Sequence, residues 1–219
     1  MYTVADRRQE ILDAALALAD ERGLDAVSMR AVASRIGVTP MALYPHVGNK
    51  EALLDGLVDR LIGDMVTAGT GYLGTGLAGP AWEGVLRGAA YGARSVARAH
   101  PTVVALLFAR PAVTDTAVAG VDLIYQALLD AGVPPARVPR LERLFTTFVL
   151  GFAISEVSGR FATGSGTGEP RQSRGRRQPD LAPAHATLAR HLAAAPDWDA
   201  EFQADLADLI VLIRAAATG

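Results

Sequence analysis

The chain has 219 residues, half of them hydrophobic, no cysteine and a formal net charge of −2 at pH 7. The lack of cysteine excludes a disulfide framework, a cysteine-based zinc site and thiol catalysis. The whole-chain charge shows none of the basic surplus that is typical of nucleic-acid-binding domains. No apolar run approaches the roughly 18–20 residues of a membrane helix. We therefore expect a soluble, cytoplasmic protein without a membrane partner.

Hydrophobic residues recur at helical spacing along nearly the whole chain, and no segment alternates in the manner of a strand. The spacing predicts a first helix over about 6–22, followed by Gly23, which suits a left-handed C-cap. Ser28 is the expected N-cap of a second helix, which Gly37 ends.

A very short third helix is expected next, with Thr39 as its N-cap and Pro40 at its first position, where a missing N–H costs nothing. It is predicted to end near 44–45, and Asn49 is expected to cap a fourth helix. Leu43 has the size and position of a core residue.

Residues 68–80 are rich in glycine and predict a break between two parts of the chain. Residues 163–180 are polar, basic and of low complexity, which predicts a mobile loop. Further helices are expected at about 80–99, 101–109, 114–131, 136–162, 183–195 and 198–217. The predicted fold is all-α, with one domain over 1–62 and a second helical domain over 63–219.

The second and third helices, joined by a glycine turn, form the pattern of a helix-turn-helix, whose second helix enters the DNA major groove. Residues 26–50 contain Arg30, Arg35 and Lys50 but no acidic residue. Cations near DNA release counterions on binding, whereas carboxylates would be repelled by the phosphates. The near-neutral average charge thus hides a small cationic segment.

The segment from Ile36 to Leu54, IGVTPMALYPHVGNKEALL, carries the pattern LY-x-H-x-x-x-K-x-x-L-L after a Gly-Val turn. It resembles the signature of the TetR (tetracycline-repressor) family. The resemblance is strong over about residues 6–60; beyond them it rests on length and the all-helical pattern.

The resemblance implies a role in DNA binding for nine residues. Arg30 would reach a guanine edge, and residues 39–42 would open the recognition helix, with apolar groups against thymine methyls. Tyr44 and His46 match positions that touch phosphates, and Lys50 would hold another phosphate at a helix N-terminus. The nine residues are Ser28, Arg30, Thr39, Pro40, Met41, Ala42, Tyr44, His46 and Lys50.

Alternatives remain for some of these positions. Tyr44 also has the character of a core support, and Arg35 that of a solvated helix charge. Pro45 departs from the aromatic or basic residue common in the family, and residues 40–42 offer few hydrogen-bond donors. Base reading is therefore expected to depend on Arg30 and on van der Waals contacts.

For the second domain, the resemblance implies binding of a small-molecule effector and formation of a homodimer. Stripes on two long helices predict a four-helix dimer interface, with a purely intrachain core as the alternative. The interface candidates are Leu141, Leu144, Phe145, Phe202, Leu206, Leu209 and Ile213. The ligand candidates are Trp82, Tyr91, His100, Phe108, Tyr125, Phe148 and Phe152.

Arg87, Arg94 and Arg98 share one helix face and would suit an anionic ligand, or else a salt-bridged surface. His100 resembles a metal-linked histidine of the tetracycline-binding members, but its neighbours supply no second ligand. We therefore expect no metal and no cofactor.

The predicted function is a ligand-responsive regulator, a repressor that binds a palindromic double-stranded DNA operator as a dimer. An all-helical adaptor that does not bind DNA is one alternative. An enzyme is another, but no catalytic residue is predicted, because Gly69–Gly76 lacks the strand and the Lys-Ser/Thr of a phosphate loop.

Overall fold

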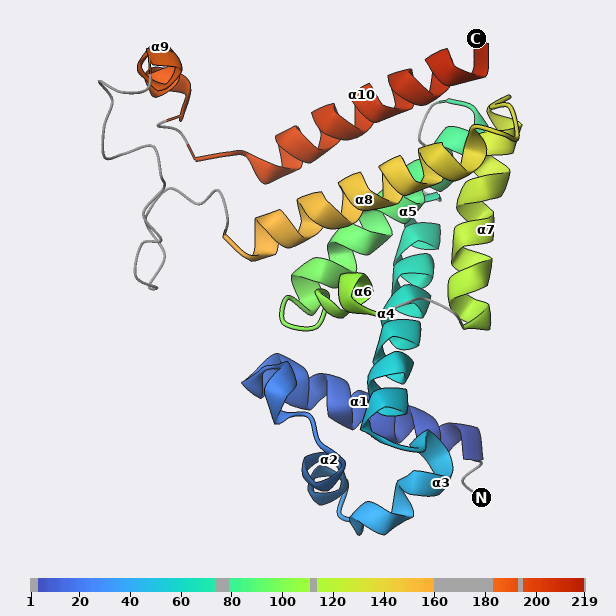
Figure 1. Ribbon diagram of the computed structural model, residues 1–219, viewed down its shortest axis with the longest axis vertical. Coiled ribbons are helices and arrows are strands. Elements are labelled where there is room, and N and C mark those ends of the chain that lie inside the picture. Colours follow the sequence, from blue (N-terminus) through green and yellow to red (C-terminus); the bar gives the residue numbers. More distant parts are fainter. Residues whose placement is uncertain (1–3, 74–78, 111–113, 160–182, 193–194, 219) are drawn as a thin grey trace.

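The computed structural model describes residues 4–73, 79–110, 114–159, 183–192 and 195–218. Every regular element within these ranges is helical, which confirms the all-α prediction (Figure 1). The predicted loop at 163–180 lies outside the described residues. The elements are α1 (Val4–Arg22), η1 (Leu24–Ala26), α2 (Met29–Arg35), η2 (Pro40–Ala42), α3 (Tyr44–Val47), α4 (Lys50–Leu73), α5 (Ala81–Ala99), α6 (Leu106–Ala109), α7 (Asp115–Asp130), α8 (Val138–Val157), α9 (Pro183–Leu192) and α10 (Trp198–Thr218).

Two hydrophobic clusters form the interior. The first joins α1, α2, α3 and the N-terminal half of α4, and it includes Val103 and Leu106 from the segment around α6. The second joins α5, α7, α8 and α10 around Phe145 and Phe202. Figure 1 shows α4 running from the N-terminal helices up to the helices of the second cluster, so this one helix connects the two parts.

The glycines of α4 and α5 mark a close helix crossing. Residues 68–73, the first part of the predicted glycine-rich break, are helical, because α4 continues to Leu73. The boundary expected near 68–80 stays a prediction. A Cβ on Gly69 would lie 2.6 Å from the carbonyl oxygen of Gly88, and a Cβ on Gly92 would lie 2.8 Å from the nitrogen of Gly69. Glycine therefore allows the two backbones to touch here.

Residues 101–109 form less helix than expected. Only Leu106–Ala109 is α-helical, and the preceding residues make tight turns in which Val103 N–H and Val104 N–H both donate to the carbonyl of His100. Both valines are fully buried. β-branched residues have low helix propensity, and their burial favours the turns instead.

No helix among the described residues combines the length and hydropathy needed to cross a bilayer. The division at residue 62 stays a prediction, since α4 passes through that position without interruption.

Candidate nucleic-acid interface and effector cavity

The turn between α2 and η2 is defined by local hydrogen bonds. The Oγ of Ser28 accepts a hydrogen bond from the N–H of Ala31 (3.2 Å), which confirms it as the N-cap of α2. At the other end, Val38 N–H donates to the carbonyl of Ala33 and Gly37 N–H to that of Ser34. This is a Schellman arrangement, and Gly37 takes its left-handed position with φ of 72°.

The segment after the turn consists of η2 and α3 in succession. Thr39 lies at the N-cap position of η2, as predicted, but its side chain makes no capping hydrogen bond. The expected end near 44–45 was wrong, since α3 continues to Val47 and Gly48 follows with φ of 70°. Pro45 is tolerated because it occupies the first turn of α3, where its missing N–H leaves no bond unmade.

One face of this segment is anchored and the other is exposed. Leu43 is fully buried, as predicted, and Val47 is 5% exposed. Met41 is 73% exposed and Tyr44 44% exposed. The packed leucine thus holds the short helices in place while Pro40, Met41 and Ala42 face solvent.

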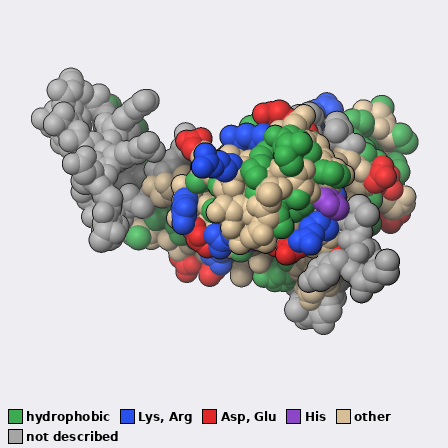
Figure 2. Space-filling model, turned by 90° about the horizontal axis from the view of Figure 1, so that it is seen from below, with side chains coloured by type: hydrophobic (Ala, Val, Ile, Leu, Met, Phe, Trp, Pro, Cys, Tyr) green, Lys and Arg blue, Asp and Glu red, His purple; other side chains and the backbone are tan. Residues whose placement is uncertain are grey.

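The structure places the nine candidate DNA contacts on α2, η2, α3, the start of α4 and the N-cap positions of α2 and η2. Seven of them are exposed, whereas Ser28 and His46 are half-buried. Figure 2 shows this end of the molecule, with hydrophobic side chains near the middle and basic and acidic side chains at the rim. The Nδ1 atom of His46 is buried without a hydrogen-bond partner. Contact with DNA stays a prediction for all nine.

Arg35, which is not among these nine residues, forms an ion pair with an acidic side chain of α1. Its guanidinium donates to both carboxylate oxygens of Glu21, at 2.8 and 2.5 Å, and so joins α2 to α1. The hydrogen bond from Arg35 lowers the pKa of Glu21 below its ordinary value. This geometry favours the structural alternative for Arg35 over a contact with DNA.

The N-terminus of α4 combines a cap with a cation. The Oδ1 of Asn49 accepts from the N–H of Ala52 (2.9 Å), which confirms the predicted cap. The exposed Lys50 opens the helix, where the first N–H groups and the helix dipole favour an anion. The acidic Glu51 beside it is paired with Arg110, so its charge is largely offset.

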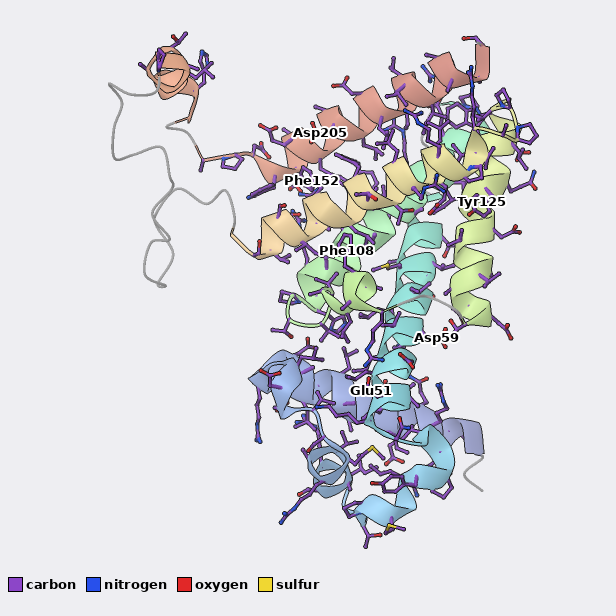
Figure 3. The ribbon with its side chains drawn as sticks, viewed as in Figure 1. Glu51, Asp59, Phe108, Tyr125, Phe152 and Asp205 are labelled. Carbon is purple, nitrogen blue, oxygen red and sulfur yellow. The ribbon has the colours of Figure 1, made fainter. Side chains whose placement is uncertain are left out.

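Arg110 connects the region of α6 to this end of α4. Its guanidinium binds Glu51 and also Asp55, the latter at 2.5 Å, and Figure 3 shows Glu51 beside the N-terminal helices. These bonds join residues 55 or more positions apart in sequence, so no local signal predicted them. A second link pairs the Nδ1 of His100 with the Oδ2 of Asp20 at 2.7 Å.

A cavity of about 300 Å³ lies beside the C-terminal half of α4. Its walls come from α4, α5, α6, α7 and α8, and its volume is at the small end of the range for ligand pockets. Small residues at the helix crossing, among them Gly69, Gly88 and Ala89, line one side.

None of the seven predicted ligand residues is among those that line this cavity, so a ligand role for them stays a prediction. Tyr91 stacks on Tyr72 with ring centroids 4.6 Å apart, Phe108 is 54% exposed, and His100 is bound to Asp20. Phe152 packs against Trp198 and Phe202, between α8 and α10 (Figure 3). The other three lie elsewhere on α5, α7 and α8: Trp82, Tyr125 and Phe148.

Two of the three arginines of the predicted face, Arg94 and Arg98, form salt bridges. Arg94 donates to both carboxylate oxygens of Glu156, at 2.8 and 2.9 Å, and lies over the ring of Phe202. Arg98 binds Glu156 and Asp199. Burial alone would raise the pKa of Glu156, but the hydrogen bonds from the two arginines outweigh it and the pKa lies below its ordinary value.

The predicted dimer interface needs a correction. All but one of the seven residues are buried within a single chain, because they face the core shared by α5, α7, α8 and α10. The exception is Leu144, which is 37% exposed. The large apolar side chains that α10 presents to solvent are Val211, at 59% exposed, and Leu212, at 44%. The buried residues are Leu141, Phe145, Phe202, Leu206, Leu209 and Ile213.

Two family models match the chain. One, described as "Bacterial regulatory proteins, tetR family", matches residues 11–57. The other, described as "Tetracyclin repressor-like, C-terminal domain", matches residues 76–214. Together they cover both the helix-turn-helix and the helices around the cavity.

Curated relatives and a solved structure agree with the family matches. An "HTH-type transcriptional regulator" of Saccharopolyspora erythraea is 29% identical over 73% of this chain and 65% of its own length. The "HTH-type transcriptional repressor DrrR1" of Streptomyces coeruleorubidus is 27% identical over 67% of this chain and 52% of its own length. The chain thus spans between half and two thirds of these relatives. The Streptomyces coelicolor protein ActR, solved in complex with actinorhodin, has the same fold, with a TM-score of 0.74, 22% identity and coverage of 97% of this chain and 98% of that one.

Proposed function

This chain belongs to the TetR family of bacterial regulatory proteins, and we propose that it is a transcriptional repressor that a small molecule releases from DNA. The observation that carries the proposal is the exposed segment Pro40–Ala42, held on a Schellman turn by the buried Leu43 and flanked by Arg30 and Lys50. Such a segment suits insertion into the major groove, with cations for the phosphates on either side. Residues 1–62 would bind DNA in the bacterial cytoplasm, and residues 63–219 would bind the effector and dimerise.

A homodimer through α8 and α10 is part of this proposal. The exposed Leu144, Val211 and Leu212, together with the half-buried Phe148, leave an apolar surface on these two helices. Exposed apolar side chains grouped on two neighbouring helices suit an interface. Two-fold symmetry would place two recognition segments about one DNA turn, roughly 34 Å, apart, and it would require a palindromic operator.

The cavity and the DNA-facing end of α4 are physically connected. Ile62, Met65 and Val66 of α4 line the cavity, as does Leu107 of α6, while Arg110 just beyond α6 binds the first turns of α4. A ligand that fills the cavity would therefore change how α4 sits relative to α6. By linkage it must bind the DNA-free arrangement better than the DNA-bound one. The solved ActR–actinorhodin complex shows that a protein of this fold holds a small molecule.

The test begins with selection of bound duplexes from a random DNA pool. With the selected operator, we expect Arg30→Ala and Tyr44→Ala each to weaken binding about tenfold or more in a gel shift, as befits loss of a base or phosphate contact. Arg35→Ala is the matched control on α2, and because Arg35 is bound to Glu21 it should cause a smaller loss. Light scattering should show that all three variants remain dimers.

Unaltered operator affinity in both Arg30→Ala and Tyr44→Ala would refute the proposed interface. A selection that enriches no duplex would favour an adaptor instead. The salt dependence of binding gives an independent check, since affinity for an operator must fall steeply as salt rises.

A further inference from the structure

The cavity walls are almost entirely hydrocarbon. Of its 19 lining residues, only Thr70 and Thr146 have a polar side chain, and none is charged. The others are aliphatic residues, glycines and one aromatic residue, Phe145. A ligand that enters this cavity therefore loses its hydrogen bonds to water, and the side chains around it can replace very few of them.

The two hydroxyl groups are already engaged as donors. The Oγ1 of Thr70 donates to the carbonyl of Thr67 at 2.8 Å. The Oγ1 of Thr146 donates to the Oε1 of Glu142 at 2.9 Å. Each hydroxyl oxygen retains the capacity to accept a hydrogen bond. The side chains that line the cavity thus offer two acceptors and no free donor.

Two charged residues near the cavity, Arg94 and Glu83, are bound to partners away from it. Ala93 lines the cavity, but the next residue, Arg94, is directed to Glu156 and stacks over Phe202. Glu83, near the start of α5, is buried and binds the Nε of Arg214 at 2.8 Å. None of the residues that line the cavity carries a charge that could neutralise an anionic ligand.

We propose, on the premise of the proposed function, that the effector is an uncharged and largely hydrocarbon molecule, whose polar groups are at most one or two hydrogen-bond donors. A carboxylate, sulfonate or phosphate in the cavity would lose its hydration and gain no counterion, and burial of an unpaired charge is strongly unfavourable. The donors of the ligand would bind the oxygens of Thr70 and Thr146. The cavity therefore selects against anions.

Two fluorescent probes with the same ring skeleton test this chemistry. N-phenyl-1-naphthylamine is neutral, whereas 8-anilino-1-naphthalenesulfonate adds one sulfonate to the same two ring systems. We expect the neutral probe to bind the full-length protein at least about tenfold more tightly than the sulfonate, measured by fluorescence titration.

A filled cavity supplies the site-specific control. A Cβ on Gly120 would lie 3.5 Å from Ile62 Cγ2, which is ordinary contact, so Gly120→Leu extends into the cavity with the helix retained. Gly71→Leu makes the same change at an exposed position of α4 with open space around it. We expect Gly120→Leu to weaken binding of the neutral probe about tenfold or more and Gly71→Leu to leave it unchanged. If Gly120→Leu does not fold, Ala89→Leu fills the cavity from α5.

The inference is overturned if the sulfonate binds as tightly as the neutral probe and is lost in Gly120→Leu. It is also overturned if neither probe binds, or if filling the cavity leaves the neutral probe bound. Operator binding by gel shift separates the two proposals: its absence removes the proposed repressor function, whereas the probe titrations decide the chemistry of the cavity on their own.

Discussion

Gly92→Ala tests the close crossing of α4 and α5 that forms one side of the cavity. The added Cβ would lie 2.8 Å from the backbone nitrogen of Gly69, 3.1 Å from its Cα, and closer still to the carbonyl oxygen of Met65. All three atoms belong to the backbone of α4, so no side-chain rotation relieves the overlap. The helices must separate by about half an ångström or more, which forfeits a quarter or more of the dispersion energy at the crossing.

The expected magnitude combines two opposing effects. Overpacking of a core costs about 1–3 kcal/mol, and the value belongs at or above the upper end because only backbone can move. Alanine regains up to about 1 kcal/mol of helix propensity over glycine. The net destabilisation is therefore about 2 kcal/mol, which corresponds to a melting temperature roughly 4–8 °C lower for a chain of this size.

Thermal unfolding followed by circular dichroism at the helix band measures this effect. Gly71→Ala, at an exposed position of α4 with no atom within 4 Å of the added Cβ, is the matched control. It should raise the melting temperature by about 2–4 °C, because propensity acts there without a clash. A melting temperature of Gly92→Ala equal to or above that of the parent would refute the reasoning.

Three further predictions concern other contacts. Arg110→Ala should weaken operator binding about two- to tenfold in a gel shift, because it frees two carboxylates near Lys50 and removes two ion pairs; unchanged affinity would contradict this. The pKa of Glu156 lies below the ordinary 4.5, so the stabilisation from its ionised form is complete above that pH and is lost as the pH falls through the lower folded value. Glu156→Gln should therefore lower the free energy of unfolding by about 2 kcal/mol at pH 7. It should also make the melting temperature fall less steeply as the pH is lowered, which a series of melting curves over pH would measure. Gly37→Ala should lower the free energy of unfolding, measured by chemical denaturation, by about 1 kcal/mol, because φ of 72° is strained for alanine. Equal stability of the variant and the parent would exclude that strain.

The helix-turn-helix was predictable because its signals are local. Ser28 and Asn49 cap helices through hydrogen bonds to residues three positions ahead, and Gly37 ends a helix through bonds to the turn before it. Leu43 follows from its place in the motif. Each of these features depends on a few consecutive residues, which the sequence shows directly.

Which side of each longer helix faces the core could be determined only from the tertiary structure. The stripe that includes Phe145 and Phe202 was expected at a dimer interface, but it faces the core of the same chain, and Leu144, Val211 and Leu212 lie outside. Both helices carry apolar residues on more than one side. Periodicity then reports that a side is apolar without indicating which neighbour covers it.

The sequence by itself determined the all-α class, the helix-turn-helix, its acid-free segment and hence the family, since these depend on composition and short-range spacing. Only the tertiary structure decided that Gly69 and Gly92 bring the backbones of α4 and α5 into close contact, that Arg110 forms ion pairs with the first turns of α4, and that apolar residues of five helices line the cavity. A cavity is the space left between helices distant in sequence. Its shape depends on how closely their backbones approach, and no local pattern contains that distance.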